Sequence, residues 1–113
     1  MSLDVYLYRA SGTEAETELY SANITHNLGL LADAVGLYQA LWSPEELGLT
    51  RANQLIDLLE RGLRRLGDRS RREEFRKLEP ANGWGTFDGL VTFTENYLAC
   101  CRDYPEALVR VSR

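Results

Sequence analysis

Residues 21–42, SANITHNLGLLADAVGLYQALW, most constrain how this chain of 113 residues can fold. From Ile24 onward, apolar residues recur every three or four positions, which is the spacing of an amphipathic helix. The pattern predicts one long helix over residues 24–42, with Asn23 or Thr25 as its N-cap. Its apolar stripe is broad, so we expect a central helix covered on most sides.

Polar groups gather in the first turn of this predicted helix, at Asn23, Thr25, His26 and Asn27. At 100° per residue, Asn27 falls within the apolar stripe, which predicts a buried asparagine. A buried amide needs hydrogen-bond partners. Two interpretations stay open: these residues cap a strand-to-helix junction, or they form a small pocket for an anion or another polar ligand.

Alternating patterns near both ends of the chain predict a small sheet. Residues 3–8 alternate apolar and polar side chains, and residues 14–21 follow the turn signal Ser11-Gly12 as a polar edge strand. Residues 107–112 form a last strand, with Ala107, Val109 and Val111 pointing inward.

Two further long helices are predicted, over residues 50–67 with Thr50 as N-cap and over residues 87–104 with Thr86 as N-cap. The order of elements indicates the α+β class, in two layers and as a single domain over residues 1–113. We expect a sheet of about three strands, the first strand central, packed against three main helices.

A second candidate site is the loop Asn82-Gly83-Trp84-Gly85, in which glycines flank a tryptophan. Glycines on both sides of the ring allow a tight turn to present it. One interpretation is that Trp84 closes one end of the core. The other is that it forms a wall of a ligand pocket or anchors an interface.

A basic segment over residues 61–77 is the third candidate, in a chain of net charge −4. It contains Asp68, Glu73 and Glu74 and no interleaved aromatic residues for stacking on bases, which argues against nucleic-acid binding. A solvated, salt-bridged face is favoured, with phosphate contacts or docking to an acidic protein as alternatives. The residues proposed for an interaction surface are Arg61, Arg64, Arg65, Arg69 and Arg72.

Several classes of protein are disfavoured by the sequence. No apolar run is long enough to span a membrane, and no signal peptide is visible. The adjacent Cys100 and Cys101 are expected to be reduced thiols in a cytoplasmic protein. His26 without further Cys/His spacing predicts no metal site, and a Cys–His catalytic pair has no local signature. We expect no cofactor.

Four short segments of the chain form a recognisable combination: SANITHNL from Ser21, ALWSPEELG from Ala40, NGWGTF from Asn82 and VRVSR from Val109. In this combination the chain resembles a group of small bacterial and phage proteins without assigned function. The resemblance covers nearly the whole chain. It implies a compact stand-alone domain and provides no catalytic residue.

The sequence therefore favours a small non-enzymatic binding or accessory protein. Its pocket would lie between the first-helix N-terminus and the tryptophan loop, with Asn23, Thr25, His26, Asn27, Asn82 and Trp84 as binding residues. The partner would be a small polar ligand or a protein. The alternative is a homo-oligomeric or protein-interaction module, in which the basic segment of one copy meets the acidic hairpin of another.

Overall fold

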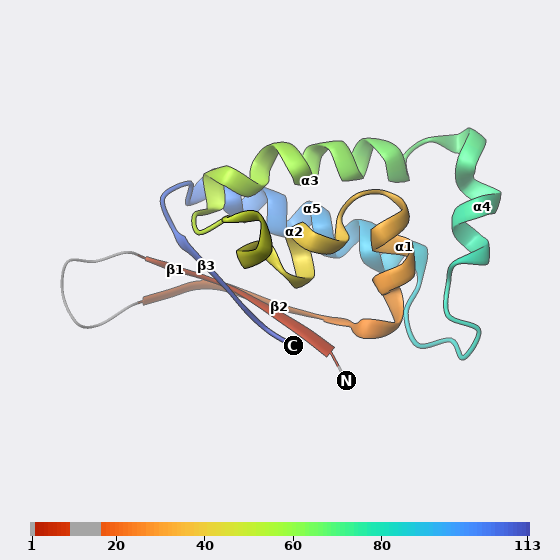
Figure 1. Cartoon of the computed structure of the whole chain (residues 1–113), viewed down its shortest axis with the longest axis horizontal. Helices are drawn as coiled ribbons and strands as arrows, with labels where there is room; N and C mark the ends of the chain where they lie inside the picture. Colours follow the sequence, from red (N-terminus) through yellow and green to blue (C-terminus); the bar gives the residue numbers. More distant parts are fainter. Residues whose placement is uncertain (1, 10–16) are drawn as a thin grey trace.

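A three-stranded antiparallel sheet lies along one side of the molecule, and the helices pack on one of its faces (Figure 1). The computed structural model describes residues 2–9 and 17–113. The strands are β1 (Ser2–Arg9), β2 (Thr17–Thr25) and β3 (Leu108–Ser112), in the order β2-β1-β3. The α+β class and the central position of the first strand are thus confirmed.

The central strand follows its alternating sequence closely. Leu3, Val5 and Leu7 are fully buried and face the helices, while the residues between them point to the other side. Val5 pairs with Ala22 of β2 and with Val111 of β3, so both edges of β1 are occupied. The predicted turn and the first residues of the predicted second strand, residues 14–16, lie outside the described residues.

Two long helices, α3 (Ala52–Leu66) and α5 (Phe87–Asp103), pack side by side over the sheet (Figure 1). Thr86 caps α5 as predicted, because its Oγ1 accepts a hydrogen bond from the Gly89 N–H at 2.9 Å. The predicted cap at Thr50 is wrong. The helix begins at Ala52, and the side chain of Gln54 accepts from the N–H groups of Thr50 and Arg51.

The predicted single helix over residues 24–42 is also wrong. β2 continues to Thr25, and three short elements follow before Ser43. These are the 3-10 turn η1 (His26–Leu28), α1 (Gly29–Ala34) and α2 (Tyr38–Trp42). Shorter helical elements elsewhere in the described chain are η2 (Pro44–Leu47), η3 (Arg69–Arg71) and α4 (Arg72–Lys77).

The break between α1 and α2 has a local cause at Gly36, whose φ of +75° does not occur in a right-handed helix. Arg65 stabilises the break, because its Nη1 donates to the Val35 carbonyl at 3.0 Å. The turn directs Leu37 onto Gly62 of α3, where a Cβ would lie only 2.3 Å from the leucine side chain. Close packing at this point therefore replaces the straight helix that the periodicity predicts.

The helical segment after α3 is held by aromatic packing. Phe75 of α4 is fully buried and stacks on Phe87 of α5, with ring centroids 6.1 Å apart. The guanidinium group of Arg71 lies over the Phe75 ring and that of Arg72 over Phe87. Among residues 2–9 and 17–113, none of the helices combines the length and the apolar character that crossing a membrane requires.

Candidate functional site

Two tryptophans that lie far apart in the sequence each contact one of two consecutive residues of η1. His26 contacts Trp42, and Asn27 contacts Trp84. The turn exists because Thr25 ends β2 and its Oγ1 accepts from the Asn27 N–H at 3.2 Å, as expected of an N-cap. The sheet thereby fixes where both contacts form.

The contact between His26 and Trp42 determines the state of the histidine ring. Trp42 Nε1 can only donate a hydrogen bond, and it donates to His26 Nδ1 at 2.7 Å. His26 Nδ1 is therefore an acceptor, and the proton of the neutral ring is on Nε2. Tyr38 stacks on the Trp42 ring, with centroids 5.3 Å apart and planes 7° apart.

A shallow hollow of about 440 Å³ lies beside this aromatic cluster. It is lined by His26, Gly29, Leu30, Asp33 and Tyr38. Nδ1 is engaged by Trp42, so the Nε2–H is the polar group of the imidazole that no residue in the described part of the chain binds. The hollow thus combines a ring donor, a carboxylate and an aromatic side chain, a combination suited to a polar or cationic group.

The Trp84 loop is fixed by its backbone while its side chain faces solvent. Asn82 Oδ1 accepts from the Trp84 N–H at 3.0 Å, and Asn27 Nδ2 donates to the Trp84 carbonyl at 3.4 Å. Gly85, with φ of +114°, lies so close to Thr25 and Leu28 that a Cβ would be within 2.9 Å of both side chains. The Trp84 side chain itself is 72% exposed.

The predicted binding residues therefore divide into groups. Thr25, Asn27, Asn82 and Trp84 come together at one end of the molecule. His26 belongs to the same turn but points toward Trp42, and Trp84 is not among the residues that line its hollow.

Three details of the sequence-based interpretation need correction. Asn27 is exposed rather than buried, because the helical wheel that placed it assumed a helix where the chain forms a strand and a 3-10 turn. Asn23 is in β2 and caps no helix; its Nδ2 lies 2.8 Å from Ser2 Oγ and 2.7 Å from Asp4 Oδ1, across the sheet. Trp84 does not close the core.

Leu30, Asp33, Tyr38 and Trp42 were missed as residues of this site. A straight helix would place His26 and Trp42, sixteen residues apart, about 24 Å from each other. The signal that could have found the contact is Gly36, since a glycine in a helical pattern also indicates a reversal of the chain.

The basic segment is partly engaged within the chain. Arg61 pairs with Asp57 at 2.6 Å, Arg65 binds the Val35 carbonyl, and Arg72 lies over Phe87. Arg64 and Arg65 line an open hollow of about 510 Å³ together with Arg61 and Asp68. The acidic hairpin that was expected to meet this segment in another copy falls mostly on residues 10–16, outside the described residues.

The cysteines are poor candidates for nucleophiles. Burial raises the pKa of Cys101 to about 12 and raises the pKa of Cys100 above its usual value, so both thiols hold their protons near neutral pH. Within the described part of the chain, no group of three or more His, Cys, Asp or Glu side chains is placed to hold a metal ion.

Comparisons with family models, with curated proteins and with solved structures found no match to this chain. The resemblance to small bacterial and phage proteins thus depends on the quoted motifs alone and stays a prediction. The function must be inferred from the geometry of the surface.

Proposed function

We propose that this chain is a small non-enzymatic binding protein that recognises a partner protein with its α1-end surface. This surface consists of Asn27, Leu30, Tyr38 and Trp84 together with the hollow beside His26. One observation carries the proposal: the Trp84 side chain is 72% exposed although hydrogen bonds and close packing hold its backbone in place.

An exposed indole on a fixed loop is suited to anchoring a protein interface. Tryptophan is enriched among residues that dominate binding energy, since it buries a large area with few rotatable bonds. A loop that is already ordered also loses little entropy when it binds. A projecting ring fits a pocket on another protein better than it encloses a small free ligand.

Neighbouring side chains extend the apolar part of this surface. Leu30 is 71% exposed and lies one turn after Asn27, which bonds to the Trp84 carbonyl. Tyr38 is partly exposed at the rim of the hollow. Leu30 and Tyr38 line the same hollow, and exposed apolar side chains grouped in this way support an interaction site more than scattered ones do.

The experiment compares proteins captured by the tagged chain from cells of its source with those captured by Trp84→Ala and Leu47→Ala variants. Leu47 is the matched control, because it is also a large exposed apolar side chain but lies in η2. We expect quantitative mass spectrometry to find a partner that the wild type and Leu47→Ala retain and Trp84→Ala loses.

The proposal fails if wild type and Trp84→Ala capture the same proteins in the same amounts while both variants remain folded. Circular dichroism of each variant provides the folding control. A partner lost equally in both variants would also contradict the proposal, because that loss would not depend on Trp84.

A further inference from the structure

The two edges of the sheet are treated differently by the fold. At β3, the first residues are covered by the segment before α3, with a bridge between Arg51 and Leu108 and a hydrogen bond from the Val109 N–H to the Thr50 carbonyl. β2 is the other edge strand and pairs with β1 alone among the described strands. Its unpaired main-chain groups form a template for another strand.

The first part of β2 has two features that protect edge strands from pairing, an irregular register opposite Leu7 and Tyr8 and the charged Glu18, whereas residues 20–25 carry neither. Proteins usually blunt such an edge with lysine, proline or a very short strand. β2 is nine residues long, with the sequence TELYSANIT, and its only charged side chain is Glu18. The regular, uncharged part of this edge, residues 20–25, is the part open to a physiological occupant.

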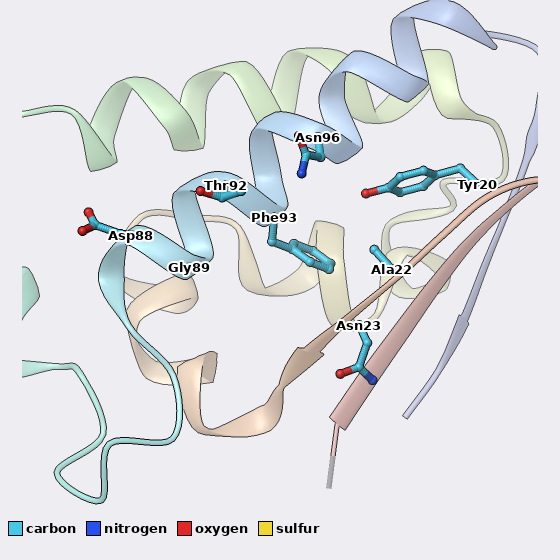
Figure 2. A pocket seen from close by; sticks show the side chains of 8 residues that line it. All are labelled: Tyr20, Ala22, Asn23, Asp88, Gly89, Thr92, Phe93 and Asn96. Carbon is cyan, nitrogen blue, oxygen red and sulfur yellow. The ribbon is translucent and has the colours of Figure 1, made fainter.

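A groove of about 470 Å³ lies beside this edge, between β2 and the first half of α5 (Figure 2). It is lined by Tyr20, Ala22, Asn23, Asp88, Gly89, Thr92, Phe93 and Asn96. Figure 2 shows the side chains of Phe93 and Asn96 extending from α5 toward β2, and the Tyr20 ring extending from β2 toward Asn96.

The lining combines apolar contact with unused hydrogen-bonding groups. Ala22 and the largely buried Phe93 provide apolar surface. The side chains of Tyr20, Thr92 and Asn96 carry polar groups that form no hydrogen bond with another residue in 2–9 or 17–113. Asp88 is the one charged residue among the described residues of the lining.

We propose that this groove binds an extended, basic peptide segment of another protein, which adds to the β2 edge as a fourth strand. Main-chain hydrogen bonds to β2 hold the peptide, and alternate side chains face Phe93 and Ala22 on one side. A lysine or arginine of the peptide pairs with Asp88. The amide of Asn96 and the hydroxyl of Tyr20 bind polar groups along the segment.

The charge of the groove favours a basic peptide over a second copy of the chain. The β2 strand of another copy would bring Glu18 and no basic residue, so it would offer nothing to Asp88. A basic peptide also matches the net charge of −4 of the whole chain, which attracts cationic partners over a distance. The groove is separate from the α1-end surface, so the two proposals can fail independently.

The test is selection of phage-displayed random dodecapeptides on the intact protein, followed by affinity measurements on synthetic copies. We expect the selected peptides to carry lysine or arginine at a fixed position. Asn96→Arg, which blocks the groove from an exposed position of α5, should weaken binding about tenfold or more. The matched control is Asn53→Arg, the same replacement at an exposed position of α3.

A second arm tests the main-chain hydrogen bonds. Methylation of alternate backbone nitrogens of a selected peptide keeps its side chains but removes its donors, and should weaken binding about tenfold. Asp88→Asn should reduce the preference for a basic residue. Trp84→Ala should leave the peptide affinity unchanged.

Four outcomes would overturn the proposal. Selection without enrichment over a bare support means that no extended peptide binds. Equal binding to Asn96→Arg and Asn53→Arg places the peptide elsewhere, and insensitivity to N-methylation excludes strand addition. Concentration-dependent dimerisation that Asn96→Arg abolishes would identify a second copy as the occupant.

Discussion

Trp42 and Trp84 contact adjacent residues of the same turn, yet their environments are opposite. Trp42 is 2% exposed, stacks on Tyr38 and donates to His26, so its ring is part of the core. Trp84 is held through its carbonyl by Asn27, and its ring contributes little to the core. A tryptophan fixed by its side chain stabilises the fold, whereas one fixed by its backbone is available to a partner.

The strongest test of this comparison replaces each ring. Trp42→Ala removes a buried aromatic side chain and should lower the free energy of unfolding by about 3–5 kcal/mol. Trp84→Ala should change it by about 0.5 kcal/mol or less, as at other exposed positions. Urea unfolding measures both. Equal losses in the two variants would mean that the Trp84 ring also belongs to the core.

Alanine substitutions at two glycines of the tryptophan loop distinguish the stability cost of close packing from the cost of backbone strain. Gly83 and Gly85 both have positive φ, but a Cβ at Gly85 would lie 2.8 Å from Thr25 Cγ2, and one at Gly83 has nothing within 4 Å. Gly83→Ala should cost about 1–2 kcal/mol from strain alone. Gly85→Ala should cost about 1–3 kcal/mol more by overpacking. Matching losses, again from urea unfolding, would rule out a tight contact between this loop and β2.

Buried side chains of the core should also make the free energy of unfolding depend on pH in the alkaline range. Burial raises the pKa of Cys101 to about 12 and the pKa of Tyr97 above its usual value, so the folded state retains these protons where the unfolded chain releases them. The free energy of unfolding should therefore fall as the pH rises from about 9 toward 12. Denaturant titrations at several pH values measure the slope, and Cys101→Ala should reduce it. An unchanged slope in that variant would contradict the assignment to Cys101.

The smallest effect is expected at the link between η1 and the loop. Asn27→Ala removes one long, exposed hydrogen bond to the Trp84 carbonyl and should cost about 0.5 kcal/mol or less. Time-resolved fluorescence anisotropy in a Trp42→Phe background, where Trp84 is the only tryptophan and can be excited selectively, should detect freer motion of the ring. Unchanged anisotropy would show that Asn82 and the packing of Gly85 hold the loop without Asn27.

Local patterns were sufficient to predict the sheet and the two long helices. Alternation in residues 3–8 identified a strand with one buried face, and this strand is central in the sheet as predicted. The residue Thr86 marked the start of α5 because an N-cap uses only local hydrogen bonds. Such features need no knowledge of distant contacts.

Distant contacts decided the parts that the sequence did not reveal. Gly36 breaks the first helix where Leu37 packs on Gly62, a contact between positions 25 residues apart. Because a long helix was predicted there, Asn27 was expected to be buried. The predicted candidate site nevertheless included the turn that contains Asn27. The exposure of Trp84 was one of two alternatives, and a helical wheel cannot decide between them because the loop has no period.

The order β2-β1-β3 has a consequence for how the chain acquires its structure. The first strand of the sequence is the central one, and its register with the last strand pairs Asp4 with Ser112. During synthesis, β1 and β2 can form a hairpin early, but one edge of β1 stays open until residues 108–112 have been made. Long-range pairing of this kind slows folding and leaves an aggregation-prone edge exposed. The sheet is therefore complete only after residues 108–112 have been synthesised. Until then, the open edge of β1 in the nascent chain must be shielded from pairing with other chains.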